Sequence, residues 1–276
     1  MRIALIQQHC DLDRAANLAR GIAAAEAAAD RGAQVIAFAE LAFDRFHPRH
    51  ACPSGPPRDL AEPISGPTIT RLQDLARRRG IVVLPNLYEL DGERTFDTTV
   101  AIDAGGEILG LTRMLHITSY EGFYETDYYT AGDRGAPVFA TAFGKIGVAI
   151  CYDRHYPEVM RALALRGAEL VVVPQAGTLG EWPDGLYEAE MRVAAFHNGY
   201  YTALVNRVGD EQGQRFAGES FVCDPEGRVI ARAAAGTDET LACELDLGAV
   251  ERSTARRLFL RDRRPELIET LLSTAP

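Results

Sequence analysis

Lysine is almost absent from this chain of 276 residues, and Lys145 is its only one. Arginine carries the remaining positive charge, and the acidic residues outnumber lysine and arginine by 39 to 29, which gives a net charge of −10. A chain with this balance presents no basic field for nucleic acid, and we expect its arginine-rich segment 252–264 to be solvated or to face a partner. The sequence therefore predicts no nucleic-acid partner.

Long apolar runs and metal-ligand patterns are missing as well. No stretch reaches the roughly 20 apolar residues of a membrane-spanning helix, and the chain opens directly on a strand-like segment, 2–6, where a signal peptide would stand. The five cysteines are odd in number and scattered, at positions 10, 52, 151, 223 and 243. His47, His50 and His155 also lack ligand spacing. We expect a cytoplasmic protein with no membrane contact, no metal and no cofactor.

The composition and the order of elements predict an α/β fold. With 47% hydrophobic residues the chain can bury a large core, and no linker or shift in composition divides it, so we expect one domain over residues 1–276. Short apolar segments alternate with amphipathic ones. The predicted strands are 2–6, 35–38, 81–84, 99–102, 146–150 and 170–173, and the predicted helices include 15–31 and 68–79. Such an order favours mixed sheets with helices outside them.

The most informative segment is 145–158, because it sets Cys151 at the end of a β-branched strand and shortly before Pro157 opens a helix. A thiol on such a turn gains from backbone N–H groups and from the positive end of the helix, which favour thiolate and can hold a developing oxyanion. This placement suits acyl transfer. Taken alone, the segment fits an ordinary buried cysteine equally well.

Four segments in order along the chain favour the catalytic interpretation. They are a strand ending in Glu40 (35–41), a basic strand followed by His116 (111–116), a segment with Glu125 before an aromatic pair (122–133) and the Cys151 elbow (147–153). Together they resemble the nitrilase, or carbon–nitrogen hydrolase, superfamily. The resemblance implies a four-layer α-β-β-α sandwich that assembles into homodimers or larger homo-oligomers. Segments 190–201 and 202–209 are similar to β-ureidopropionases, and segment 259–267 is similar to N-carbamoylputrescine amidases.

The resemblance breaks at one position. Counting back two residues from His116 places Met114 where the family has its catalytic lysine. Lys145 begins the cysteine strand about six residues before the elbow, too far to replace it at roughly 3.3 Å per residue. Arg113 is adjacent, but on a strand its side chain points to the opposite face. Natural loss, a deliberate substitution and a remodelled site are all compatible with the sequence.

The resemblance implies a mechanism for the retained residues. Cys151 attacks the carbonyl carbon of a small linear amide or N-carbamoyl substrate and forms a thioester, Glu40 acts as the base, and Glu125 positions Glu40 or the substrate amine. In the family the lysine and the backbone N–H after the cysteine hold the oxyanion. Met114 cannot donate a hydrogen bond, and one lost donor costs on the order of 10² to 10³ in rate.

We therefore expect a weakened or inactive carbon–nitrogen hydrolase. The alternative is a non-catalytic homologue that keeps the fold for binding or assembly, and acyl transfer to an amine would use the same residues. Four further residues are predicted to shape substrate binding: His116, Tyr152, Gln175 and Trp182. His116 is expected on a half-buried strand with a supporting role, and rim packing explains the other three equally well. Asp184 and Glu188 are candidates for binding an amine-bearing substrate or for a solvated surface.

Overall fold

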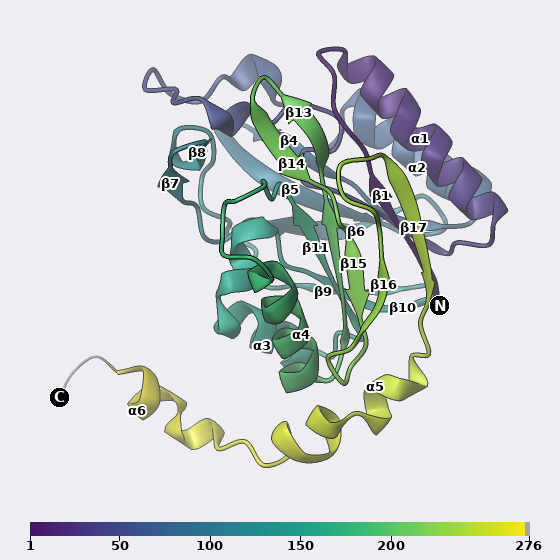
Figure 1. The fold of residues 1–276 in the computed structure, drawn as a ribbon, viewed down its shortest axis with the longest axis vertical. Coiled ribbons are helices and arrows are strands. Elements are labelled where there is room, and N and C mark those ends of the chain that lie inside the picture. The colour runs from purple at the N-terminus through teal and green to yellow at the C-terminus, as the bar shows by residue number, and fades with distance from the viewer. Residues whose placement is uncertain (274–276) are drawn as a thin grey trace.

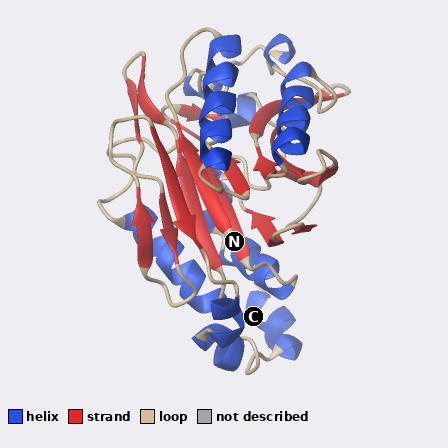
Figure 2. Cartoon of the chain, turned by 90° about the vertical axis from the view of Figure 1, so that its right-hand side faces the viewer, coloured by secondary structure: helices blue, strands red, loops and turns tan. Residues whose placement is uncertain are grey.

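Two β-sheets packed face to face, each covered outside by a pair of helices, form the protein in the computed structural model, which describes residues 1–273 (Figures 1 and 2). The first sheet contains β1(Arg2–Gln7), β2(Val35–Phe38), β3(Val82–Leu84), β4(Asn86–Asp91), β5(Arg94–Ile102), β6(Ile108–Arg113) and β17(Glu239–Glu244). Its order is β17-β1-β2-β3-β5-β4, with β6 paired to β5.

The second sheet has six strands in the order β16-β15-β12-β11-β10-β9. They are β9(Val138–Thr141), β10(Gly144–Val148), β11(Leu170–Gln175), β12(Tyr201–Asn206), β15(Phe221–Cys223) and β16(Val229–Arg232). Two small antiparallel pairs lie outside the sheets: β7(Ser119–Tyr120) with β8(Phe123–Tyr124), and β13(Val208–Glu211) with β14(Gln214–Ala217).

Four helices cover the sheets: α1(Arg14–Asp30) and α2(Pro67–Arg79) on the first, and α3(Pro157–Leu165) and α4(Leu186–Asn198) on the second. The C-terminal segment with α5(Gly248–Arg252) and α6(Ile268–Leu272) runs along one end of the sandwich and then away from it (Figure 1). Short helical turns complete the chain: η1(His47–Arg49), η2(Arg58–Leu60), η3(Glu125–Asp127), η4(Cys151–His155), η5(Ala255–Phe259) and η6(Pro265–Leu267). None of the helices within 1–273 is long and apolar enough to cross a bilayer.

The central strands are apolar on both faces because each sheet is covered twice. Along β2, Ala37 lies in the core between the sheets, whereas Phe38 packs in the core under α1 and α2. Along β11, Val172 lies between the sheets and Val173 packs under α3 and α4. This two-residue alternation is the side-chain period of a strand. The expected four-layer α-β-β-α sandwich is confirmed.

One local expectation was wrong. His116 does not lie on a strand, because β6 ends at Arg113 and the Met114 N–H is the last to reach β5, where it donates to the Asp97 carbonyl at 3.0 Å. The N–H groups of Leu115 and His116 donate instead to the carboxylate of Asp153 in η4, at 2.9 and 3.0 Å. Cys151 begins η4, which lies between β10 and α3 and forms the expected turn from strand to helix.

Candidate active site

Cys151 and Glu40 each lie just beyond the carboxyl end of a parallel strand. β2 runs parallel to β1 and β3, and β10 runs parallel to β11. The carboxyl ends of parallel strands are where open α/β sheets bind ligands. Left-handed backbone accompanies both residues, with φ of 44° at Leu41 and 42° at Cys151. Non-glycine residues in this conformation are uncommon and gather at functional sites, so both strand ends have the backbone of a built site.

The backbone around Glu40 is fixed from two sides. Arg207, which follows β12 and is buried, donates from Nη1 to the carbonyl oxygens of Glu40, at 2.9 Å, and of Leu41. Its Nη2 pairs with the Glu211 carboxylate. On the other side the Leu41 N–H donates to Oδ1 of Asn86 at 2.7 Å. The second sheet therefore holds the strand end of the first, which places the Glu40 side chain between them.

The Glu40 carboxyl group is fully buried, and neither of its oxygens has a hydrogen-bond partner among the described residues. Burial and the neighbouring Glu125 charge raise the pKa of Glu40 to about 8, while the Cys151 thiol opposes that rise. The thiol is thus a neighbour of the carboxyl group, without a formed hydrogen bond to it. Such contacts commonly tighten only when substrate binds, and a pKa near the working pH suits a general base.

The Cys151 thiol is buried, and its pKa is raised well above the ordinary value, first by burial and then by the charge of Glu40. The guanidinium of Arg154 lowers it, whereas Glu125 and Glu181 raise it further. A buried thiol in acidic surroundings keeps its proton near neutral pH. It therefore needs a base at the moment of attack, and Glu40 is the carboxyl group that faces it.

Arg154 connects three elements behind the thiol. Its Nη1 donates to the carbonyl oxygen of Cys151 at 2.9 Å and to Oε1 of Gln175 at 2.8 Å, and its Nε donates to Glu190 at 3.1 Å. Its guanidinium carbon lies 4.7 Å from the Tyr187 ring centroid. Nη2 of Arg154 and Nε2 of Gln175 are buried and have no partner in the described structure. Unpaired buried donors are rare in native proteins, and here they suit a bound substrate or water.

Two more acidic residues act on the thiol from loops. Glu125 begins η3 and is buried, and burial is the main reason that its pKa is raised well above the ordinary value. Glu181, in the loop after β11, accepts hydrogen bonds from the hydroxyls of Tyr120 at 2.6 Å and Tyr187 at 2.5 Å. The Thr178 N–H donates to the same carboxylate at 3.0 Å. These neutral donors stabilise the carboxylate without cancelling its charge.

Met114 is buried in the apolar core between the sheets, in the same cluster as Ala39 and Cys151. Its N–H donates to the Asp97 carbonyl at 3.0 Å, and its carbonyl accepts from the Gly132 N–H at 2.8 Å. A Cβ at Gly132 would lie 2.8 Å from the Met114 carbonyl oxygen, so only glycine fits against this backbone. Met114 is thus held firmly and has no hydrogen-bond donor on its side chain.

The neighbouring Arg113 binds elsewhere, as the strand geometry predicts. Its guanidinium donates to Glu89 at 2.6 and 2.8 Å, to Asp91 at 2.8 Å and to Asp133 at 3.0 Å. These are complete charge-assisted pairs. Lys145 is exposed at the start of β10. Neither cation contributes to the pKa shifts of Glu40 and Cys151.

His116 supports the site from outside it. Its Nδ1 lies 2.7 Å from the Asp153 carboxylate, and its ring stacks on Tyr156 with centroids 3.4 Å apart. Because Asp153 lies two residues beyond Cys151, these contacts join the loop after β6 to η4. The structure therefore gives His116 contacts that suit the expected supporting role.

Two of the other predicted binding residues, Tyr152 and Trp182, lie in one aromatic group with His155 and Tyr120. Tyr152 packs on His155 at 5.0 Å, and Trp182 packs on His155 at 5.3 Å and on Tyr120 at 6.0 Å between ring centroids. The indole N–H of Trp182 has no partner in residues 1–273. Glu188, by contrast, pairs with two surface arginines, Arg192 and Arg232, so its charge is already matched.

Sequence reasoning missed five residues of this site: Asp97, Arg154, Glu181, Tyr187 and Arg207. Arg154 directly follows segment 147–153 and Arg207 stands inside segment 202–209, but nothing in a sequence shows which backbone carbonyls a guanidinium will reach. Glu181 directly precedes Trp182, which is one of the predicted binding residues. The acidic residues predicted to bind an amine, Asp184 and Glu188, follow that tryptophan instead.

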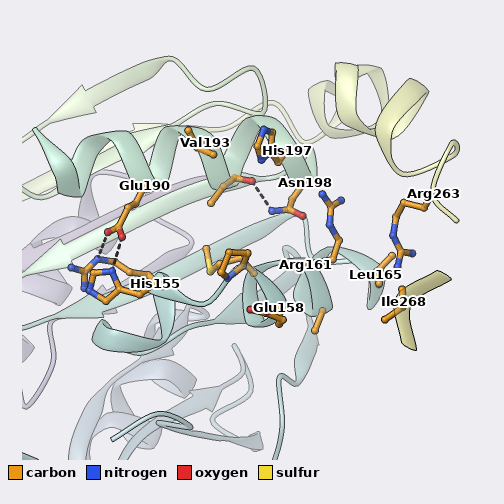
Figure 3. Close-up of a pocket in the computed structure, with 15 residues that line it drawn as sticks. His155, Glu158, Arg161, Leu165, Glu190, Val193, His197, Asn198, Arg263 and Ile268 are labelled. Carbon is orange, nitrogen blue, oxygen red and sulfur yellow. Dashed lines mark hydrogen bonds and ion pairs between the residues drawn. The ribbon is translucent and has the colours of Figure 1, made fainter. Parts of the chain in front are cut away.

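A large pocket lies away from the thiol. Its volume is about 750 Å³, and it opens between α3, α4 and the C-terminal segment, with Leu165, Val193 and Ile268 on its walls (Figure 3). Cys151 and Glu40 do not line it. Glu190 and His155 stand at one end, where they pair with each other (Figure 3). Within the described residues, no three His, Cys, Asp or Glu side chains are arranged to hold a metal ion.

The comparisons with known proteins agree with this geometry. The family model described as carbon-nitrogen hydrolase matches residues 2–255. An N-carbamoylputrescine amidase from Solanum lycopersicum is 34% identical over 289 residues, which cover 98% of this chain and 94% of that protein. A crystal structure of a carbon-nitrogen hydrolase from Helicobacter pylori has a TM-score of 0.92 and 29% identity, covering 100% of this chain and 99% of that one.

A second similar structure bears on the cysteine. It is a glutamate-to-glutamine mutant of an amidase from a Nesterenkonia species, and it shows the result of Michael addition of acrylamide at the active-site cysteine. Its TM-score is 0.83 at 29% identity, and the match covers 99% of this chain and 100% of that chain. The predicted family resemblance and the predicted fold are both confirmed.

Proposed function

The chain belongs to the carbon–nitrogen hydrolase family, and from that premise we propose that it hydrolyses small linear amides or N-carbamoyl compounds through a thioester on Cys151. We further propose that Met114 slows this reaction. The observation that supports the proposal most is the pairing of a buried thiol at a left-handed strand end with the unpartnered carboxyl group of Glu40.

The reaction needs one proton to move back and forth at Glu40. As the Cys151 sulfur bonds to the carbonyl carbon, Glu40 takes the thiol proton and the carbonyl oxygen becomes an oxyanion. The C–N bond then breaks, Glu40 returns the proton to the leaving nitrogen, and the thioester remains. Glu40 next takes a proton from water, the hydroxyl oxygen bonds to the acyl carbon, and the C–S bond breaks as the leaving sulfur takes that proton back from Glu40, which restores the thiol and the carboxylate. Glu125 orients Glu40 or the leaving amine.

The weak point of the reaction is the oxyanion. Met114 offers no donor, so the backbone N–H of Tyr152, in the first turn of η4, is the donor we assign to it. The loss of one preorganised donor typically lowers the rate on the order of 10² to 10³. We therefore expect slow turnover from this chain.

The charge around the thiol favours a substrate with a positive end. Glu40, Glu125 and Glu181 all raise the pKa of Cys151, and Arg154 opposes them. Glu181 is bound by neutral donors only, so its charge is free to attract a cation. N-Carbamoylputrescine, named in the tomato relative, has a primary ammonium at the end away from the carbamoyl group. We propose a substrate of this kind, with its ammonium at Glu181.

Ammonia release from a panel of N-carbamoyl amines, N-carbamoyl β-amino acids and simple amides tests the function. The panel is run on the unaltered chain, on Met114→Lys and on Met114→Leu, which changes the side chain without adding a donor. We expect a gain on the order of 10² to 10³ with lysine and none with leucine. If no variant releases ammonia from any compound, a binding or assembly role replaces the proposal.

The site of the ammonium is tested by Glu181→Gln, made in whichever form of the chain turns over. Because glutamine keeps the size and loses the charge, we expect KM for cationic substrates to rise about tenfold or more, with KM for neutral amides nearly unchanged. Equal changes for both groups of substrate would show that Glu181 only supports the loop.

We also propose that a second copy of the chain covers the pocket between α3, α4 and the C-terminal segment. Leu165, Val193 and Ile268 are 50%, 50% and 40% exposed there, and apolar patches of this kind mark interaction surfaces. The C-terminal segment extends beyond the sandwich, within reach of a neighbour (Figure 1). Light scattering should show a dimer or larger oligomer that Val193→Glu weakens. A monomer at all concentrations would overturn this proposal.

A further inference from the structure

A second buried carboxyl group stands beside Glu40. Asp97 lies on β5, its side chain is fully buried, and its Oδ1 accepts a hydrogen bond from Nδ2 of Asn86 at 2.6 Å. Its Oδ2 has no partner in the described structure, and neither has either oxygen of Glu40. The two side chains are close enough to shift each other's pKa, and the charge of Glu40 raises the pKa of Asp97. Three unpaired carboxyl oxygens in one buried place call for an explanation.

A proton held between the two groups supplies that explanation. An ionised carboxylate only accepts hydrogen bonds, so two carboxylates cannot satisfy each other, and their charges repel in a buried site. One protonated carboxyl group donates to the other and removes the repulsion. Pairs of this kind give up their protons at well-separated pH values.

The surrounding hydrogen bonds indicate which oxygen of Asp97 carries the proton. Oδ1 of Asn86 accepts from the Leu41 N–H at 2.7 Å, so the amide must present its NH₂ group to Asp97. Oδ1 of Asp97 is therefore an acceptor, and its other oxygen, Oδ2, is the one free to carry a hydrogen. Two hydrogen bonds through Asn86 thus orient the Asp97 carboxyl group and connect it to Leu41, the residue after Glu40.

The charged groups on each side favour the same assignment. Glu125 acts on both carboxyl groups with negative charge, so the two differ in that Asp153 adds its negative charge at Asp97, and the Tyr129 hydroxyl lies near both groups. Arg207 acts on Glu40 with positive charge, and the Cys151 thiol faces it. Negative surroundings favour the protonated acid and positive surroundings favour the carboxylate. Asp97 is therefore the proton holder and Glu40 the group that ionises.

We propose that Asp97 keeps its proton throughout the reaction and donates a hydrogen bond from Oδ2 to the Glu40 carboxylate. The inference rests on the proposed function only in naming Glu40 as the base. Asp97 is a positioning residue, since it acts through Glu40 and does not touch the thiol. It supplies a neutral donor to the base in a site where Met114 supplies no cation.

The pKa shifts agree in direction. Burial is the largest cause for both groups and raises the pKa of each. The Asp97 side chain lowers the pKa of Glu40, and the Glu40 side chain raises that of Asp97, as expected when Asp97 is the donor.

Infrared spectroscopy of the protonated carboxyl groups tests the proposal without any need for activity. The full chain is produced with isotopically labelled aspartate, which separates the aspartic acid band from the glutamic acid bands. Spectra are taken about one pH unit above the Glu40 pKa of about 8, where that residue is mostly ionised. We expect a protonated aspartic acid band that Asp97→Asn removes. Asp262→Asn, an exposed control whose carboxylate pairs with Arg261, should leave the band in place.

A spectrum in which Asp97→Asn changes no protonated aspartic acid band would overturn the proposal. This outcome is distinct from failure of the proposed function, because the band depends on the proton and not on turnover. A protein that hydrolyses nothing can still show it, and an active one can lack it.

The rate at which iodoacetamide alkylates Cys151 shows whether the proton matters to the base. Asp97→Asn keeps a donor toward Glu40, so we expect an alkylation rate within about threefold of that of the unaltered chain. Asp97→Ala removes the donor, so the pKa of Glu40 should rise. The alkylation rate near neutral pH should then fall about tenfold for each unit of that rise. The rescue by Asn over Ala separates positioning from general support of the fold. Equal pH profiles for Asn, Ala and the unaltered chain would contradict the proposal.

Discussion

At the end of β6 two consecutive residues face two groups of carboxyl side chains, and only one of these groups has a cation. Arg113 donates to Glu89, Asp91 and Asp133, and its guanidinium lies 3.8 Å from the ring centroid of Phe96. Met114 points into the core between the sheets, on the side of the candidate site. The acidic residues that act on one another there are Glu40, Asp97 and Glu125.

The difference shows that neighbouring groups of buried carboxyl side chains can serve different ends: one stabilises the fold and the other can exchange protons. Around Arg113 every carboxylate has a charge-assisted donor, so the cluster is stable and has no proton to exchange. Around Glu40 the carboxyl groups are buried without a paired cation, and burial raises the pKa of each of them, that of Glu40 to about 8. Groups of the second kind are the ones that serve as acids and bases.

Removal of the Cys151 thiol should have the largest effect on activity, and it changes the candidate active site alone. With Cys151→Ala no thioester can form, so ammonia release should fall to the uncatalysed level, also in the presence of Met114→Lys. The free energy of unfolding should change little by comparison. Cys243→Ala, a half-buried cysteine on β17, is the matched control and should retain the activity.

Removal of the Arg113 guanidinium should instead reduce the free energy of unfolding. Arg113→Met leaves Glu89 buried without its cation, which typically costs about 3 to 5 kcal/mol. Met114→Leu conserves volume at the adjacent position and should cost less than about 1.5 kcal/mol. Urea unfolding of the two variants measures both values. Equal losses would mean that the two sides of β6 do not differ as described.

The buried carboxyl group of Glu40 should also make the free energy of unfolding depend on pH. Because the pKa of Glu40 is raised from 4.5 to about 8, the folded chain keeps a proton there that the unfolded chain releases between these values. The stabilisation is complete below pH 4.5 and is lost as the pH rises through about 8. Unfolding free energies over this range should therefore fall less steeply in Glu40→Gln. The surface variant Glu188→Gln should keep the original slope.

The sequence was sufficient for the parts of the fold that depend on local pattern. The strand at 35–38 was predicted as observed, and the helices at 15–31 and 68–79 begin and end within one residue of α1 and α2. Asp13 caps the first through the N–H groups of Ala15 and Ala16, and Gly80 ends the second in a left-handed turn. Such signals are local, and they need no knowledge of the partner segments.

The parts that failed depend on contacts between distant segments. The strand at 111–113 stops before His116 because Asp153, about 37 residues later, accepts from the N–H groups of Leu115 and His116. Asp97 becomes a partner of Glu40 only because β5 and β2 lie in one sheet with β3 between them. In the sequence it is one acidic residue in a strand. The fold alone turns it into half of a carboxyl pair.

The most direct test of the catalytic proposal is mass spectrometry of the acyl-enzyme. Met114→Lys and the unaltered chain are mixed with a small amide that the ammonia assay finds to be a substrate, quenched in acid and digested. We predict an acyl mass on the peptide that contains Cys151, present before the steady state is reached and absent in Cys151→Ala. Ammonia release with no acyl mass on Cys151, or with the acyl group on another residue, would contradict the proposed thioester.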